Sequence, residues 1–113
     1  MSNRIKRPIL YGLKGHNPIP FYSINDFYEH CPNDEQRRVG LTKVGGVEIS
    51  TVFLTVDHAP HGLTPILFET MVFGLVCSDT DFEYGCWRYT TWEEAEQGHE
   101  RICAELRAKV ISN

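Results

Sequence analysis

The pattern of apolar and polar residues predicts an antiparallel sheet in the middle of the chain. The segment Val44-Gly45-Gly46-Val47 is typical of a two-residue hairpin turn, because glycine tolerates the positive φ angles that such turns require. The turn sets a register in which Lys43 pairs with Glu48, Thr42 with Ile49, Leu41 with Ser50 and Val39 with Val52. Both predicted strands carry apolar residues on both faces, so we expect the sheet to be covered on both sides.

Two further strands complete the predicted sheet. Residues 66–73 are apolar on both faces, which indicates a central strand, and residues 84–89 form the last strand. Residues 1–22 are predicted to be an extended N-terminal arm, since Pro18 and Pro20 favour extended backbone. Within this arm, residues 9–13 could add a short edge strand. We therefore expect a meander of four or five strands with short connections.

Two helices are predicted at the sides of this sheet. Ser23, with Asp26 three residues later, is typical of an N-cap and predicts a short helix at residues 23–31. Thr91 and Glu94 form a capping box for a second helix at residues 91–110, with the same pair of residue types one position earlier as the alternative frame. One stripe of the second helix is apolar and comprises Trp92, Ala95, His99, Ile102, Cys103, Leu106 and Val110. This stripe predicts that the helix packs across the sheet.

Gly98 lies inside the second predicted helix, where a glycine costs about 1 kcal/mol relative to alanine. We expect a bulky ring to approach the helix at this point, and Trp87 is the expected neighbour.

Together the elements predict an α+β fold in one domain spanning residues 1–113. The fold is an antiparallel meander of four to five strands, with one short N-terminal helix and a C-terminal helix packed across the sheet. The 113 residues are 42% hydrophobic and 23% charged, which is typical of one globular domain. No apolar run approaches the roughly 20 residues of a membrane span, and the first ten residues lack the apolar centre of a secretory signal. We therefore expect a soluble protein.

Charge and cysteine content narrow the functional classes. Eleven Lys and Arg against fifteen Asp and Glu give a formal charge of −4, which argues against a dedicated nucleic-acid binder. Residues 79–100 hold seven acidic residues and one arginine, which predicts a solvated acidic face or, alternatively, a phosphate-mimicking surface. Cys31, Cys77, Cys86 and Cys103 show no CxxC spacing, so we expect free thiols and neither a metal nor a cofactor.

Glu69 is the most informative polar residue. It stands among large apolar residues in the predicted central strand, and a buried carboxylate must be paired or protonated. Arg88 on the next strand is the natural partner for an ion pair. The alternative is that Glu69 acts as a general acid or base, or as a ligand.

Three histidines offer further chemistry. Asp57 and His58 could form a proton-transfer pair, or Asp57 could instead cap the backbone of the following loop. His58 and His61 lack additional ligands at the spacing that zinc requires. His99, on the apolar stripe, is either a hydrogen-bonded core residue or a ligand or base.

Aromatic residues gather late in the chain and would form part of the core. Any that remain exposed beside Arg88 would anchor a partner protein. The residues are Phe73, Phe82, Tyr84, Trp87, Tyr89 and Trp92.

Five blocks spread over most of the chain carry a resemblance to a known family. They are YGLxGHxPxP (residues 11–20), RRV (37–39), VxISTVFLxxDH (47–58), PxLFETMVF (65–73) and RYxTWEEAxxGHE (88–100). This order resembles a family of small proteins of tailed bacteriophages and prophages. The resemblance implies a phage or prophage origin and the cytoplasm of a bacterial host cell, but no reaction. The shared polar residues, which are the candidate binding residues, are His16, Asp57, His58, Glu69, Arg88 and His99.

The sequence departs from this family at Ala59-Pro60-His61, where relatives are rich in glycine and proline. This departure argues against His61 as a shared ligand.

Three functions are compatible with these observations. The small size, the acidic charge and the lack of a complete catalytic set favour a non-enzymatic phage accessory protein that binds a host or phage protein, with counter-defence as one such role. A small hydrolase or nucleotide-processing enzyme is the first alternative, and it requires Asp57, His58, Glu69 and His99 to converge. A minor virion or assembly component is the second alternative.

Overall fold

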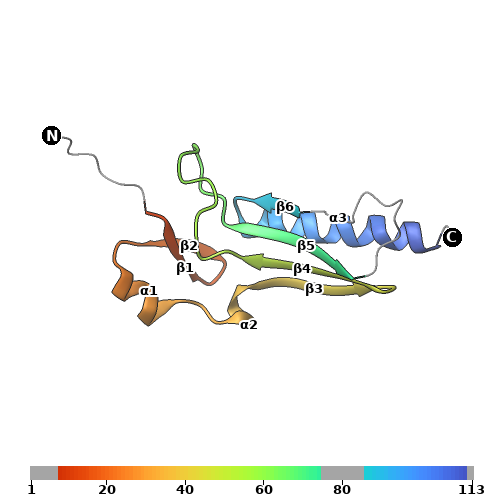
Figure 1. Ribbon diagram of the computed structural model, residues 1–113, viewed down its shortest axis with the longest axis horizontal. Helices are drawn as coiled ribbons and strands as arrows, with labels where there is room; N and C mark the ends of the chain where they lie inside the picture. Colours follow the sequence, from red (N-terminus) through yellow and green to blue (C-terminus); the bar gives the residue numbers. More distant parts are fainter. Residues whose placement is uncertain (1–7, 75–85, 112–113) are drawn as a thin grey trace.

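The turn at Gly45-Gly46 joins the first two strands of a four-stranded antiparallel sheet with the order β3-β4-β5-β6 (Figure 1). The computed structural model describes residues 8–74 and 86–111. The elements are β1 (Leu10–Lys14), β2 (Asn17–Phe21), α1 (Ile24–His30), α2 (Asp34–Arg37), β3 (Arg38–Val44), β4 (Val47–Phe53), β5 (Phe68–Gly74), β6 (Cys86–Tyr89) and α3 (Trp92–Ile111). The predicted α+β class is confirmed, as are the meander and the helix across it. The predicted start of the last strand at residues 84 and 85 lies outside the described residues.

The register of β3 and β4 follows the glycine turn. Gly45 has a φ of 60° and Gly46 has no positive φ, which is typical of a type II′ turn. The pairs of Lys43 with Glu48, Thr42 with Ile49 and Leu41 with Ser50 are confirmed, but the pair of Val39 with Val52 is wrong. A β-bulge between Arg38 and Gly40 places Arg38 opposite Val52 instead.

The bulge has a packing reason. It lets Val39 pack against the buried cluster around Phe53 and Phe68. It also places Gly40 against α3, where a Cβ would come within 2.8 Å of the His99 ring.

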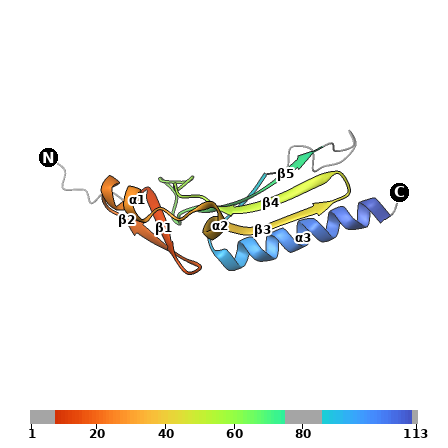
Figure 2. The same cartoon turned by 90° about the horizontal axis from the view of Figure 1, so that it is seen from below.

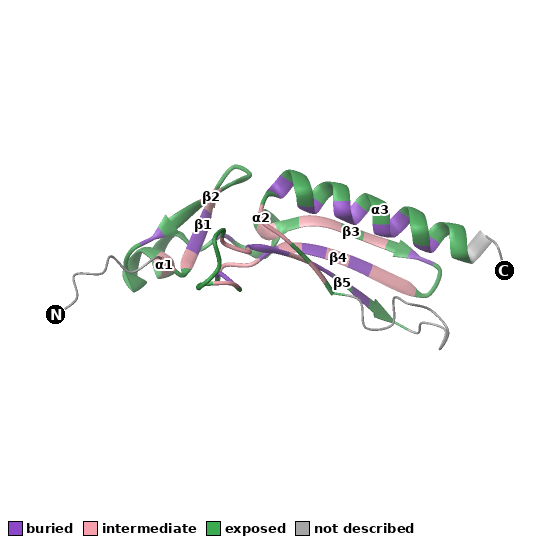
Figure 3. Ribbon diagram, turned by 90° about the horizontal axis from the view of Figure 1, so that it is seen from above, coloured by how far each residue is buried: buried purple, intermediate pink, exposed green. Residues whose placement is uncertain are grey.

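The helix α3 covers one face of the sheet along the length of the strands (Figure 2). Its buried residues recur at three- and four-residue steps on the side that meets the sheet (Figure 3). One cluster near the glycine turn comprises Val44, Ile49, Val72, Ile102, Cys103 and Leu106. A second cluster at the other end comprises Tyr11, Phe53, Leu67, Phe68, Trp92 and Ala95. Burial of these apolar side chains is the main favourable term that fixes α3 to the sheet.

The expectation that both faces of the sheet are covered is wrong for the described part of the chain. On the face opposite α3, Leu41 is 45%, Met71 36% and Phe73 48% exposed. These residues alternate with the buried ones along each strand, as side chains of a pleated strand must. The sheet therefore has one dry face and one face that is open to solvent.

Residues 8–30 form a separate layer at one end of the sheet, which we call the N-terminal lobe (Figure 1). The sequence predicts an extended arm here, and in the structure its two extended strands pair with each other as the hairpin β1–β2, which turns at Gly15 with a φ of 63°. Tyr11 N–H donates to the Thr55 carbonyl at 2.9 Å, and Asp57 N–H donates to the Ile9 carbonyl at 2.8 Å. These bonds tie the lobe to the chain that follows β4.

The predicted helix caps are both present. Asp26 N–H donates to the Ser23 hydroxyl at 3.1 Å and starts α1. Glu94 N–H donates to the Thr91 hydroxyl at 3.1 Å, and Thr91 N–H donates to the Glu94 carboxylate at 3.2 Å, so Thr91 and not Thr90 is the N-cap.

Among the residues that the structure describes, no helix is both long and apolar enough to cross a membrane.

Gly98 is approached by a ring, but the ring belongs to Tyr89 and not to Trp87 as the sequence predicts. A Cβ at Gly98 would collide with the phenol of Tyr89. Tyr89 and Trp87 lie on the same face of β6, and Tyr89 is the one whose hydroxyl reaches across to Thr70 under the helix.

This contact predicts that Gly98→Ala destabilises the protein. Alanine should gain about 1 kcal/mol of helix propensity, but overpacking against Tyr89 should cost about 1–3 kcal/mol. We expect a net loss in the free energy of unfolding, measured by urea denaturation. Gly46→Ala is the matched control, because nothing lies within 4 Å of a Cβ there, and a gain in stability for Gly98→Ala would contradict the packing described.

Candidate functional site

A chain of polar side chains lies buried between α3 and the sheet. Thr51 and Thr70 are fully buried, and His99 is 7% exposed. Thr51 and Thr70 are opposite each other in the β4–β5 register, and their hydroxyls are 2.5 Å apart. His99 Nδ1 lies 2.7 Å from the Thr51 hydroxyl, and His99 Nε2 lies 2.9 Å from the Thr42 hydroxyl. Every ring nitrogen of this buried histidine therefore has a partner.

One arrangement of donors satisfies every hydrogen bond of this hydroxyl chain. The Tyr89 hydroxyl donates to Thr70 at 3.1 Å. Thr70 can then donate to Thr51, and Thr51 to His99 Nδ1, so that each hydroxyl donates once. His99 is left with its proton on Nε2, which donates to Thr42. The hydroxyl chain thus comprises Tyr89, Thr70, Thr51, His99 and Thr42, and in this arrangement the imidazole carries its proton on Nε2.

The surroundings of His99 favour its neutral form. Burial lowers the pKa of the His99 imidazole below the ordinary value of 6.5, and the charge of Arg107 acts in the same direction while that of Glu100 opposes it. The helix covers the hydroxyl groups of Thr51 and Thr70 completely. A substrate cannot reach these groups, so His99 is a hydrogen-bonded core residue, one of the two roles that the sequence suggests.

Glu69 and Arg88 form the predicted ion pair. Arg88 Nε lies 3.0 Å from Glu69 Oε2, and the Cys86 thiol donates to the same oxygen at 3.2 Å. Partial burial and the bond to Glu69 raise the pKa of the Cys86 thiol. The three side chains lie on the open face of the sheet, because Thr70, which follows Glu69, points to α3. Glu69 is therefore paired on the open face of the sheet and not in the core under α3.

Asp57 closes the loop that follows β4. Its Oδ1 accepts the N–H of Ala59 at 2.8 Å and that of Ile66 at 3.0 Å. The residue is 3% exposed, so these donors compensate a carboxylate that is out of contact with water. The capping role is confirmed. The neighbouring His58 is exposed, and its backbone N–H donates to the Ile66 carbonyl at 3.0 Å.

His16 lies at the tip of the β1–β2 hairpin and stacks flat on Trp92 at the start of α3. The ring centroids are 3.8 Å apart, with an interplanar angle of 3°. This stack joins the N-terminal lobe to the helix.

The structure does not bring the six candidate residues into one site. Glu69 and Arg88 meet on the open face, whereas His99 lies under α3 on the other face. Asp57 is engaged by the loop backbone, and His16 is held at the hairpin tip. The cluster required for a hydrolase is therefore not assembled. Among residues 8–74 and 86–111, no three His, Cys, Asp or Glu side chains are grouped so that they could hold a metal ion.

The late aromatic residues are mostly core, as expected. Trp92 is buried and Trp87 and Tyr89 are half-buried, whereas Phe73 is exposed on the open face. Phe82 and Tyr84 lie outside the described residues, as does Cys77.

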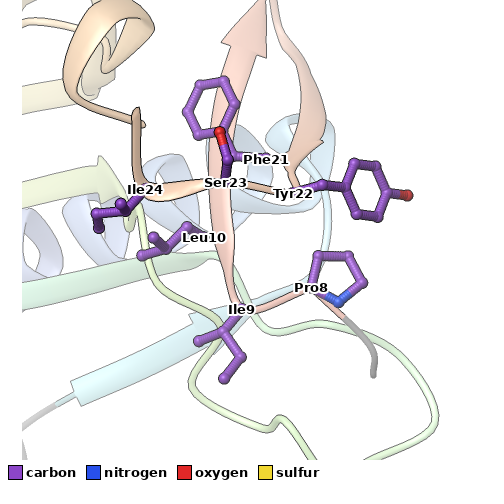
Figure 4. A pocket seen from close by; sticks show the side chains of 7 residues that line it. All are labelled: Pro8, Ile9, Leu10, Phe21, Tyr22, Ser23 and Ile24. Carbon is purple, nitrogen blue, oxygen red and sulfur yellow. The ribbon is translucent and has the colours of Figure 1, made fainter. Parts of the chain in front are cut away.

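Exposed anchor residues occur instead in the N-terminal lobe. Tyr22 is 77%, Ile24 54% and Tyr28 76% exposed, and α1 contains no buried residue. Tyr22 and Ile24 point to opposite sides of Ser23 and border an apolar groove of about 380 Å³ that is also lined by Ile9 (Figure 4). The sequence predicts the helix but not this exposed surface, because a shared face of Ile24, Phe27 and Tyr28 does not show whether another layer covers it. No signal in the sequence separates this exposed face from a buried one, because both have the same helical periodicity.

The hydroxyl chain predicts a specific cost for Thr51→Val. Valine preserves the shape but removes the group that joins His99 to Thr70, which leaves buried partners unsatisfied, so we expect a loss of about 2 kcal/mol in the free energy of unfolding. Thr64→Val, at an exposed loop position, should change stability by less than about 0.5 kcal/mol. Equal effects of the two substitutions in chemical denaturation would contradict the role of the chain.

His99 also predicts a pH dependence. Below pH 6.5, the ordinary pKa, the unfolded chain binds a proton that the folded protein does not. The free energy of unfolding should therefore fall with decreasing pH, by at most about 1.4 kcal/mol per pH unit, until the lowered folded pKa is reached. Urea denaturation of His99→Gln should show a flatter profile in this window, whereas His61→Gln, at an exposed position, should keep the wild-type slope. An unchanged slope in His99→Gln would rule out this origin.

Comparison of the chain with known protein families, curated proteins and solved structures gives no match. The function is therefore argued from the arrangement of the side chains themselves.

Proposed function

We propose that the protein is a non-enzymatic binding module whose N-terminal lobe docks onto a partner protein. The observation that carries this proposal is that α1 buries none of its residues although it contains Ile24, Phe27 and Tyr28. A helix of seven residues gains little stability on its own. Only Phe27 of these three packs against the lobe, so the exposed Ile24 and Tyr28 are suited to cover a partner.

The chemistry of the lobe fits a protein interface. Tyr22 and Tyr28 each combine a large apolar ring with a polar hydroxyl, and tyrosine is enriched among residues that dominate binding energy. Phe27 makes ring contacts with Phe21 at 6.2 Å and with Tyr28 at 5.8 Å. Tyr28 is therefore packed against another aromatic ring while most of its own surface stays exposed.

The acidic residues Asp26 and Glu29 are exposed on α1 and border the apolar side chains. A complementary partner surface would be apolar at its centre, with basic residues at its edge. Docking would use side chains and not strand addition, because Pro18 and Pro20 lie on the free edge strand β2 and have no N–H to donate.

The family resemblance supports a partner of host or phage origin in the bacterial cytoplasm. Interference with a host defence protein is one role of this kind. The separation of Glu69 from His99 by the sheet weighs against the hydrolase alternative.

This function predicts that one partner is lost when the two tyrosines are replaced. Tagged wild-type protein should capture a specific protein from lysate of the infected bacterium, identified by mass spectrometry, and the double variant Tyr22→Ser, Tyr28→Ser should capture at least tenfold less of it. Leu63→Ser, at a fully exposed loop position, is the matched control and should capture as much as wild type. Circular dichroism should show that all three proteins are folded.

Retention of the same partner by the double variant would show that the lobe is not the docking surface. Recovery of the protein as a constituent of purified phage particles would favour the virion alternative.

A further inference from the structure

One buried side-chain donor in the described part of the chain has no hydrogen-bond acceptor. Trp92, the first residue of α3, is 6% exposed, and its indole Nε1–H forms no hydrogen bond with any described residue. A buried N–H without an acceptor has lost its hydrogen bond to water and gained none in return. The conformation that buries this indole is therefore less stable than its apolar contacts alone would make it.

Two aromatic rings of the described residues contact the indole of Trp92. Phe68, which is fully buried, meets it edge-on with the centroids 6.1 Å apart, and His16 stacks flat on it at 3.8 Å. His16 is itself exposed and lies at the turn of the β1–β2 hairpin, beside the start of α3 (Figure 2). Phe68 cannot move without disturbing the core, whereas His16 can leave the indole by a movement through solvent. His16 is therefore the movable part of the cover.

The hairpin is tied to the rest of the fold at its base and not at its tip. At the base, the backbones of Ile9 and Tyr11 form hydrogen bonds with Asp57 and Thr55. Residues 12–17 form no hydrogen bond or ion pair with another element of the described chain, and Leu13 is only partly buried there. A hairpin that is tied at one end can swing about that end.

A pocket of about 360 Å³ lies beside the tip and gives it room to move. It is bounded by residues 13–16 of the hairpin, by Glu35, Gln36 and Arg38, and by Trp92. Apart from Trp92, the residues that line it are exposed or half-buried. The tip can therefore shift in this space without displacing another buried side chain.

We propose that the stack of His16 on Trp92 is a latch that opens while the rest of the fold stays intact. In the closed position the latch holds the N-terminal lobe against α3 and seals the indole N–H without an acceptor. In the open position the hairpin tip moves away, and the indole N–H reaches water or an acceptor on a partner. A partner that contacts both the lobe and α3 would bind the two positions with different affinities and so select one of them. The inference concerns how the lobe is held and does not depend on the function proposed above.

Hydrogen exchange of the Trp92 indole N–H, measured by NMR on the full chain, tests the latch. The chain has two tryptophans, so Trp87→Phe assigns the signal. The Trp92 indole N–H should exchange at the same rate with and without a low concentration of urea, since opening of the tip exposes little surface. The backbone amide of Ile102, in the buried cluster near the glycine turn, should exchange more slowly and should accelerate in urea, because it exchanges through global unfolding.

Variants of His16 test which residue closes the latch. His16→Ala should accelerate exchange of the Trp92 indole N–H about two- to tenfold, as loss of one aromatic contact allows, and this exchange should still not respond to urea. His16→Phe retains a flat ring and should restore a rate close to that of wild type. His61→Ala, at an exposed loop position, is the matched control and should leave the rate unchanged.

Two results would overturn the proposal. If exchange of the Trp92 indole N–H follows that of the Ile102 amide in urea, the indole opens only when the whole protein unfolds. If His16→Ala leaves the rate unchanged, the histidine does not close the latch. The double variant Tyr22→Ser, Tyr28→Ser should exchange like wild type, so that failure of the proposed docking surface and failure of the latch can be told apart.

Discussion

The hydrogen bonds of His99 to two strands position α3 on the buried face of the sheet. Its ring nitrogens bond Thr42 on β3 and Thr51 on β4, and the ring fits only because Gly40 has no side chain at that point. Apolar burial holds α3 against the sheet but does not fix its position along the strands, since dispersion and hydrophobic contacts are not directional. The hydrogen bonds of the hydroxyl chain are directional, and a shift of the helix by one turn would leave several buried polar groups without partners. We infer that this polar contact gives α3 its register.

Only one face of the sheet is covered by α3, and this explains why the candidate polar residues do not form one site. Alternation along β5 sends Thr70 to α3 and Glu69 to the open face. Residues that are neighbours in the sequence are thereby divided between a sealed layer and a solvated one. Five of the six shared polar residues thus have four different structural settings, which are a core hydrogen-bond chain, a surface ion pair, a loop cap and a ring stack, whereas His58 is exposed. Each of these settings stabilises the fold by itself, without a common ligand.

The features of the fold that depend on a few neighbouring residues, such as turns and helix caps, could be predicted from the sequence. The glycine turn predicted three cross-strand pairs correctly, and Ser23 and Thr91 marked the starts of the two helices. The ion pair of Glu69 with Arg88 could be predicted because a meander places consecutive strands side by side. The failures concern contacts made between distant segments. The bulge at Val39 depends on the cluster around Phe53, and the neighbour of Gly98 depends on how α3 crosses β6. The exposure of α1 depends on the absence of a layer above it, which periodicity alone does not show.

The two outer strands of the larger sheet differ, because β3 contains a bulge and β6 does not, and this difference limits how copies of this chain could pair through their sheets. Head-to-tail growth would require β6 of one molecule to pair with β3 of the next, and the bulge in β3 interrupts a regular ladder there. Pairing of β6 with β6 of a second copy is self-complementary and closes after one step. In the described part of the chain, the ladder of the larger sheet is therefore regular at the β6 edge and interrupted at the β3 edge, and this difference disfavours open-ended growth through the sheet.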